Sequence, residues 1–279
     1  MRYRPFGATY GMAVSTVSLL LEDRRLMSAR DWRDLLNAAM MAGINCFELV
    51  GSSEALIEGL RQALAGVERR LVFLAWQAPA IGDPAMAAGQ VMRQLEVDYL
   101  DLLILLDPSR APQVQTLRQD RLVRQVGVCG EGEVADLALT MNGIDALITP
   151  YSLTSGWKDR HRLKVASERN MAVIAYDICP VALTGDDKPS IIPKGWFRKK
   201  KAADSKGPYQ FLNEAHGWTA EEICLAFALF EPAVTSVRIE ADSIERITRL
   251  AAVPERDLPT GVAAQIEMAR FTVDDRRRP

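Results

Sequence analysis

Three carboxylates could share a reaction site, because each falls at or near the end of an apolar stretch. They are Glu48, Glu54 and Asp107. A pair of carboxyl groups in one cleft can divide the work of general acid and general base when their environments set different pKa values. Acidic side chains are, however, mostly solvated. Three separately solvated acids are therefore favoured over a catalytic pair.

Histidine and cysteine offer little further chemistry. The two histidines, His161 and His216, have no metal-ligand spacing and no serine or cysteine pattern of a catalytic triad nearby, so we expect no metal site. The four cysteines lie far apart and form no CxxC pair: Cys46, Cys129, Cys179 and Cys224. Such spacing favours reduced thiols that fill the core of a cytoplasmic protein.

The stretch 98–108, DYLDLLILLDP, predicts the central strand that positions any site. Its apolar run lacks strict alternation, which is typical of a parallel strand buried on both faces, and Asp107 and Pro108 end it. Chemistry in barrels of parallel strands collects at the carboxyl ends of the strands. Here that position holds Leu105 and Leu106, which have no proton to give, and Asp107 alone can titrate.

The remaining chain alternates short apolar runs with helical patterns. Apolar runs predict strands over 17–21, 44–50, 71–75, 125–128, 145–149, 172–176 and 235–239, besides the central one. Helices are predicted over 28–43, 53–64, 84–95, 112–118, 133–140, 160–170, 219–229 and 243–252, with Ser28, Ser53 and Thr219 as N-caps. Eight such pairs predict an α/β fold, a (β/α)8 TIM barrel forming a single domain over 1–279, with an extra helix over 260–270.

The segment from Thr184 to Trp218 after the seventh strand is too long for a plain connection. It is basic, and Trp196 and Phe197 stand among its lysines and arginine. One interpretation is a solvated loop. The other is a lid or docking segment on the carboxyl face, where Lys194 to Lys201 would bind an anion or an acidic protein partner.

Composition limits the partners. The chain has 279 residues, 48% of them hydrophobic and 25% charged, which is typical of a globular protein with a sizeable core. A formal net charge of -2 argues against nucleic acid or an anionic membrane as the main partner. No segment reaches the roughly 18 apolar residues of a membrane span.

Several stretches, in order, resemble the aldo-keto reductase superfamily over nearly the whole chain. The opening residues 1–7 and Val14-Ser15 are similar to the family's first hairpin. Later matches to family motifs are AGINCF at 42–47, LEVDYLDL at 95–102, LVRQVGV at 122–128, PYSL at 150–153 and VIAY at 173–176. The resemblance implies the barrel fold and hydride transfer from a nicotinamide nucleotide to a carbonyl carbon.

The resemblance also implies a catalytic tetrad, which this sequence does not keep. In such enzymes a tyrosine donates the proton, and a lysine that an aspartate orients lowers the pKa of this tyrosine. A histidine positions the carbonyl oxygen. The aspartate position is Glu48, the tyrosine falls in Gly51-Ser52-Ser53, the lysine position is Gln77 or Trp76, and the histidine position is Leu106. Loss of one general acid typically costs about 10²- to 10⁴-fold in rate. We therefore expect no catalytic residue of the family type.

The cofactor positions implied by the resemblance are mixed. Tyr176 matches the tyrosine on which the family stacks the nicotinamide, although a tyrosine at a strand end can also simply fill the barrel mouth. The carboxamide contacts correspond to Cys129-Gly130 and Ile148-Thr149. Glu240 stands where the family binds the adenosine 2′-phosphate, and Arg246 where an arginine or glutamine is usual, or it is an ordinary exposed arginine. NAD(H) is thus expected over NADP(H), if either binds.

Three functions remain open. The first, which we favour, is a catalytically inactive relative that acts as a regulator or scaffold and senses NAD(H), in the manner of oxidoreductase-like regulators of cell division. The second is a divergent NAD(P)-dependent reductase of a small carbonyl compound, with Glu48 or Asp107 as a replacement acid. The third is a binding barrel for an unknown small molecule.

Overall fold

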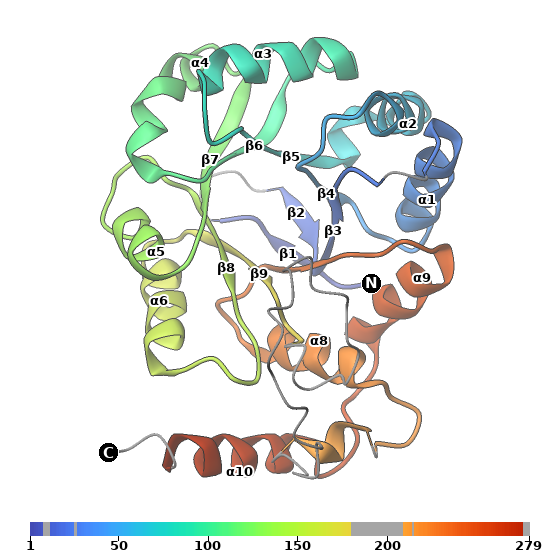
Figure 1. Cartoon of the computed structure of the whole chain (residues 1–279), viewed down its shortest axis with the longest axis vertical. Helices are drawn as coiled ribbons and strands as arrows, with labels where there is room; N and C mark the ends of the chain where they lie inside the picture. The colour runs from blue at the N-terminus through green and yellow to red at the C-terminus, as the bar shows by residue number, and fades with distance from the viewer. Residues whose placement is uncertain (8–11, 25–26, 180–208, 214, 276–279) are drawn as a thin grey trace, which may run out of the picture.

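Eight parallel strands form a closed barrel in the computed structural model, which describes residues 1–7, 12–24, 27–179, 209–213 and 215–275 (Figure 1). Around the barrel the strands follow the order β10-β3-β4-β5-β6-β7-β8-β9. They are β3 (Val17–Leu21), β4 (Cys46–Leu49), β5 (Phe73–Gln77), β6 (Leu100–Leu105), β7 (Val123–Cys129), β8 (Ala146–Pro150), β9 (Ala172–Tyr176) and β10 (Ser236–Ile239). The (β/α)8 prediction is confirmed.

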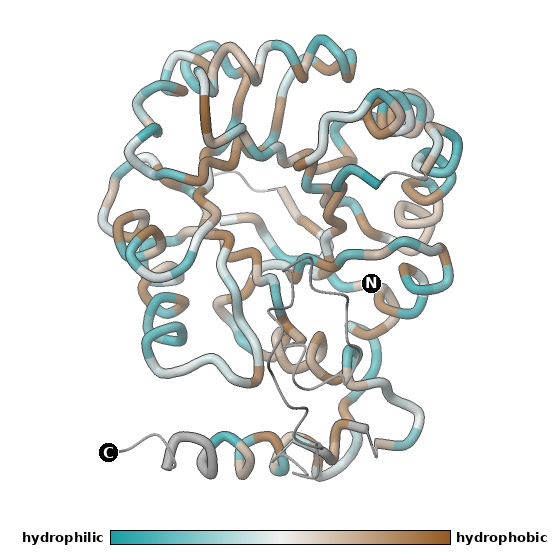
Figure 2. The backbone as a smooth tube through the Cα atoms, in the orientation of Figure 1, coloured by the Kyte–Doolittle hydropathy of each residue, from teal (hydrophilic) through white to brown (hydrophobic). Residues whose placement is uncertain are grey.

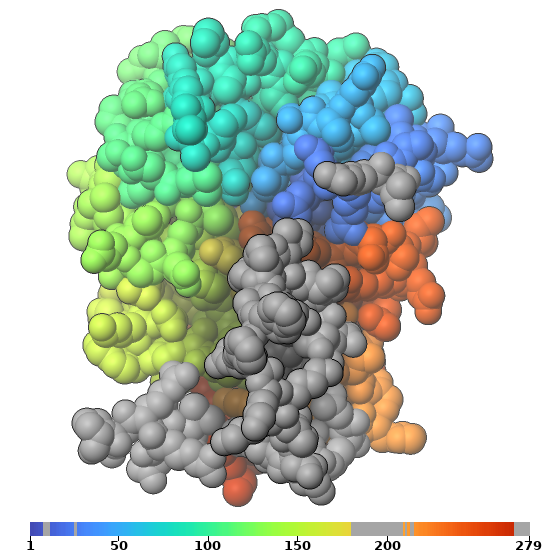
Figure 3. All heavy atoms as spheres, in the orientation of Figure 1, coloured from blue at the N-terminus to red at the C-terminus, as the bar shows by residue number. Residues whose placement is uncertain are grey.

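Helices surround the barrel, and in a space-filling view the chain colours run round it in sequence order (Figures 1 and 3). The α-helices are α1 (Ala29–Met41), α2 (Glu54–Ala65), α3 (Pro84–Leu95), α4 (Gln115–Gln119), α5 (Gly132–Ala138), α6 (Trp157–Glu168), α8 (Ala220–Phe230), α9 (Ile244–Ala252) and α10 (Val262–Asp275). Short 3-10 turns are η1 (Arg69–Leu71), η2 (Pro108–Val114), η3 (Gln210–Asn213) and η4 (Val253–Glu255).

Local capping explains most helix starts. The side chains of Ser28, Ser53 and Thr219 each accept a hydrogen bond from a backbone N–H of the first turn, as predicted. Two helix starts differ from prediction by about three residues. The helix expected from 112 begins as η2 because Asp107 accepts from the backbone N–H of Ser109, and the helix expected from 160 begins earlier, where Asp159 accepts from the N–H of Gly156.

A hairpin of β1 (Tyr3–Pro5) and β2 (Ala13–Ser15) closes the amino end of the barrel, which agrees with the resemblance of the opening residues. Phe6 is fully buried, and its ring lies 4.4 Å from that of Phe73 in β5. Phe6 and Val14 pack with interior side chains of the strands in one buried cluster. Because this end is plugged by hydrocarbon, a ligand can enter only at the carboxyl ends of the strands.

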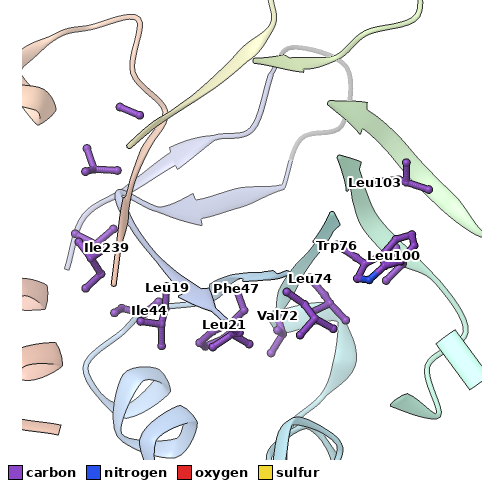
Figure 4. Packing of buried hydrophobic residues seen from close by; sticks show 14 of the residues in the cluster. Leu19, Leu21, Ile44, Phe47, Val72, Leu74, Trp76, Leu100, Leu103 and Ile239 are labelled. Atoms are coloured by element: carbon purple, nitrogen blue, oxygen red, sulfur yellow. The ribbon is translucent and has the colours of Figure 1, made fainter. Parts of the chain in front are cut away.

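A second hydrophobic layer lies between the strands and the helices. Figure 4 shows its side chains, among them Leu21, Leu74 and Leu103, projecting from the strands toward the helices. Several helices, α1 among them, carry both hydrophilic and hydrophobic residues, as expected for helices with one covered face (Figure 2). The barrel is therefore a fixed frame whose strand ends can hold polar groups.

The C-terminal helix predicted over 260–270 is present as α10. Val262, Ile266 and Ala269 pack against α8, where Ile223 and Cys224 are fully buried. Most of the basic segment 184–218, including Lys194 to Lys201, lies outside the described residues. No helix in the described part of the chain is long and apolar enough to cross a membrane.

Asp101, on β6, is a buried carboxylate that ties three strands together. It accepts from the backbone N–H of Leu74 at 2.9 Å and from Arg69 at 2.8 Å, and its other oxygen accepts from Arg124 at 3.1 Å. Both guanidinium groups also lie over the ring of Tyr99, at 4.2 and 3.5 Å from its centroid. A fully buried carboxylate is tolerated here because each of its oxygens has a charged partner.

We expect Asp101→Asn to lower the free energy of unfolding by about 3 kcal/mol, because removing one partner of a buried pair leaves the other charges uncompensated. Urea unfolding measures this as a lower midpoint. The control is Asp34→Asn, which removes an exposed ion pair with Arg33 and should cost less than about 1 kcal/mol. Equal losses in the two variants would contradict the structural role of Asp101.

Candidate functional site

A second buried carboxylate, Glu48 on β4, faces the interior of the barrel near its carboxyl end. Its Oε1 accepts from Nη1 of Arg238 on β10 at 2.7 Å, and the two strands flank β3. The Glu48 side chain is 1% exposed and that of Arg238 13%. The expectation that Glu48 is a solvated acid is therefore wrong, whereas Glu54 and Asp107 are exposed. The three carboxylates do not form a catalytic pair.

Arg238 also lies over the ring of Tyr176, the last residue of β9, at 4.3 Å from the ring centroid. The thiol of Cys129, at the end of β7, lies close enough to Arg238 and Tyr176 for both to influence its pKa. Four side chains from four strand ends thus meet, and we call Glu48, Cys129, Tyr176 and Arg238 the mouth cluster. Its cation already covers one face of the tyrosine that the resemblance assigns to nicotinamide stacking.

The pKa shifts in the mouth cluster follow from burial. Burial raises the pKa of the Cys129 thiol to about 11, and burial also raises the pKa of Tyr176, with the charge of Arg238 opposing the rise. Burial raises the pKa of Glu48 as well, and Arg238 offsets part of that effect. The 2.7 Å charge-assisted contact with Arg238 favours the charged form of Glu48. Neither Cys129 nor Tyr176 is therefore poised to donate a proton near neutrality.

The residues that the resemblance aligns with the lysine and histidine of the tetrad, Gln77 and Leu106, are not acids. Gln77 ends β5 and Leu106 follows β6, and both are partly buried. Asp23 accepts from the backbone N–H groups of Ser52 and Ser53. A Cβ added to Gly51 would lie 2.4 Å from the Asp23 carboxylate, so this loop has no room for a side chain there.

A cavity of about 460 Å³ opens beside the mouth cluster, at the ends of β7, β8 and β9. Carboxylates, hydroxyl groups and one thiol line it: Glu131, Pro150, Ser152, Thr154, Ser155, Asp159, Asp177 and Cys179. Asp177, directly after Tyr176, adopts a left-handed backbone conformation with φ of 49°, which turns the chain sharply at the end of β9. Among the described residues, no group of three His, Cys, Asp or Glu side chains could hold a metal ion.

Glu240 and Arg246 lie on a different part of the carboxyl face, at the end of β10 and in α9. Glu240 is exposed. Arg246 donates to Glu221 of α8 at 2.5 Å. Burial lowers the pKa of Arg246, but the hydrogen bond and charge of Glu221, with Asp242 and Glu240 nearby, outweigh it and raise the pKa overall. Arg246 is thus partly buried and paired with a carboxylate, and its assignment to the cofactor site stays a prediction.

These observations define a (β/α)8 barrel with a plugged amino end and a polar mouth built around a buried ion pair. A model of the aldo/keto reductase family matches residues 21–270. The chain belongs to the aldo/keto reductase family. No curated protein sequence matches it.

Solved structures show the same fold. The chain is similar to the aldo-keto reductase AKR11C1 from Bacillus halodurans in its holo form, with a TM-score of 0.74, 20% identity and 96% of each chain covered. The apo form of the same protein gives a TM-score of 0.73 and 19% identity, again with 96% of each chain covered. At this level of identity the likeness concerns the fold.

Sequence reasoning missed Arg238, although a signal for it was present. Alternation along β10 places residue 238 on the same face as the buried Ser236, and a charged residue inside a buried strand requires a partner. Glu48 sits in the same way within the apolar run of β4. Two lone opposite charges in two buried strands therefore predict an ion pair inside the barrel.

We expect Arg238→Met to lower the free energy of unfolding by about 3–5 kcal/mol, because Glu48 would remain buried without its partner. The double variant Glu48→Leu with Arg238→Met should recover most of this loss, since apolar pairs often replace buried ion pairs without penalty. Chemical denaturation of the three proteins measures both. If the double variant is as unstable as the single one, Arg238 stabilises the barrel by packing and not by pairing with Glu48.

Proposed function

We propose that this chain is an aldo-keto reductase homologue that does not reduce carbonyl compounds and acts as a regulatory or scaffolding protein that senses NAD(H). The observation that carries the proposal is the Glu48–Arg238 pair. The residue at the family's aspartate position is bonded to an arginine, and that arginine lies on Tyr176.

The chemistry of the family supports this reading. As hydride reaches a carbonyl carbon, the oxygen becomes an alkoxide, and a general acid near neutrality must meet it. Burial raises the pKa of both Tyr176 and Cys129, and Gln77 and Leu106 supply no acid. Arg238 favours the charged form of Glu48, the carboxyl group of the mouth cluster. Together the mouth residues can bind and orient a ligand more readily than they can protonate one.

The residues present fit one end of a nicotinamide dinucleotide better than the other. Bound nicotinamide would bring a hydride-transfer ring to the mouth. The ring could stack only on the face of Tyr176 that Arg238 leaves free, or it would have to displace Arg238. Displacement of Arg238 would leave Glu48 without its partner. Ile148 and Thr149 provide no carboxamide side chain for the ring amide. We therefore expect modest affinity, with the adenosine end contributing most of it.

At the adenosine end, Glu240 favours an unphosphorylated ribose. A 2′-hydroxyl can donate to a carboxylate, as in other dinucleotide folds that select NAD. A 2′-phosphate would meet the charge of Glu240, and Arg246 is already paired with Glu221. Two like charges about 4 Å apart at an effective dielectric near 20 oppose each other by about 4 kcal/mol.

The proposed sensing role includes a cellular compartment, a protein partner and a cellular process. We place the protein in the cytoplasm, where thiols stay reduced. Docking of an acidic protein partner at Lys194 to Lys201 stays a prediction, because those residues lie outside the described part of the chain. A role in cell division is the most specific form of the hypothesis.

We expect negligible reduction of aldehydes or ketones near neutral pH, below about 1 turnover per second with either reduced nucleotide. Oxidation of NADH or NADPH, followed by absorbance against a panel of carbonyl compounds, measures this. Faster turnover that Glu48→Gln abolishes would establish Glu48 as a replacement acid and the protein as a divergent reductase. The matched control is Glu54→Gln, an exposed acid of the same face.

Calorimetry with the four nicotinamide nucleotides should show tighter binding of NAD(H) than of NADP(H), by about two powers of ten for the charge repulsion at Glu240. Glu240→Lys should move the preference toward NADPH, and Glu245→Lys controls for the change in net charge. Tighter binding of NADPH by the unmodified protein would refute the argument. Absence of heat with every nucleotide would favour a barrel for another small molecule.

A further inference from the structure

Two of the four thiols lie in contact beside the mouth. Cys179 follows Tyr176 by three residues, and Cys224 lies in α8. Cys179 packs against the hydrophobic cluster that contains Cys224, and the two thiols are close enough to shift each other's pKa. They also share one hydrophobic cluster, in which Ile223 and Leu153 are fully buried. The prediction of core-filling thiols is confirmed for Cys224, which is fully buried, whereas Cys179 is only partly buried.

The two thiols differ in access and in acidity. Cys179 is partly buried and lines the mouth cavity, so a small molecule can reach it, whereas Cys224 is fully buried. The hydrogen bond from Cys224 lowers the pKa of Cys179, although burial opposes the shift. The same bond, and burial, raise the pKa of Cys224. Cys179 is thus the thiol that a dissolved oxidant reaches first, and Cys224 lies behind it in the core.

We propose that Cys179 and Cys224 form a reversible dithiol–disulfide site that cross-links the segment after β9 to α8 when the protein meets a hydroperoxide. The proposal rests on the contact between the thiols and on the access of Cys179 from the cavity. It does not depend on nucleotide binding.

The reaction balances with the peroxide as the two-electron oxidant. The Cys179 thiolate attacks one peroxide oxygen, the O–O bond breaks, and the other oxygen leaves as water or an alcohol after taking a proton. Cys224 then attacks the sulfur of the Cys179 sulfenic acid. The S–S bond forms, the S–O bond breaks, and the departing hydroxide leaves as water with the Cys224 proton. A dithiol reductant reverses the change by thiol–disulfide exchange.

The cross-link would act on the cavity wall. Cys179 and Asp177 line the cavity, and Tyr176 lies in the mouth cluster just before them. A disulfide would fix this segment to α8, whose Glu221 is already paired with Arg246 of α9. Oxidation would thus link the cavity wall beside Tyr176 covalently to α8, the helix whose Glu221 pairs with Arg246.

The experiment is peptide mapping of the full-length reduced protein after brief exposure to hydrogen peroxide, alkylation of remaining thiols and digestion with trypsin. The cysteines fall in four separate tryptic peptides, 34–61, 125–158, 170–194 and 207–238. We expect one dominant cross-link, between 170–194 and 207–238, that disappears with dithiothreitol. The same exposure in urea should lower its yield by about tenfold, because unfolding removes the preformed contact.

Variants provide the matched controls. Cys129→Ser should leave the cross-link unchanged, because burial raises the pKa of Cys129 to about 11 and it is not part of the pair. Cys224→Ser should abolish the cross-link and leave Cys179 to oxidise further to the sulfinic acid. A dominant link between Cys179 and Cys129, or a Cys179 that stays fully alkylatable in the folded protein, would overturn the proposal. Mapping of the unmodified chain decides this even if a variant fails to fold.

Discussion

The mouth of this barrel depends on one constraint, the burial of a carboxylate and a guanidinium between β4 and β10. Neither charge can be left alone in the interior, because an unpaired buried ion costs far more than the pair. Glu48 and Arg238 therefore hold each other at 2.7 Å. Once Arg238 is fixed there, its planar group lies over Tyr176 and contacts Cys129, and the positions of four strand ends become coupled through one side chain.

This coupling is consistent with our proposal that the reductase fold is kept here without the catalytic residues of a reductase. The frame is held by two hydrophobic layers, the hairpin plug at the amino end and the Asp101 network on the helix-facing side. None of these elements requires a particular residue at the carboxyl ends of the strands. Proton-donating side chains at the carboxyl ends of the strands can therefore be replaced by an ion pair without a change in the barrel fold.

The fold was largely predictable from the sequence, whereas the site was predictable only in part. Apolar runs, caps such as Ser28 and the order of motifs predicted every barrel strand, because periodicity and capping are local. The position of Tyr176 at a strand end followed in the same way. The contacts of Arg238 with Glu48, and of Cys179 with Cys224, did not follow, because both join residues far apart in sequence whose distance depends on barrel closure. Charge in a buried strand signals that a partner exists without identifying it.

The two buried carboxylates of the barrel differ in a way that bears on function. Asp101 faces the helices, and both of its oxygens accept hydrogen bonds, so its role in the frame is complete. Glu48 faces the interior, and its Oε2 has no hydrogen-bond partner among the described residues. A buried acceptor of this kind is costly unless water or another donor reaches it. Glu48 is therefore the less completely satisfied of the two buried carboxylates, and Asp101 the more completely satisfied one.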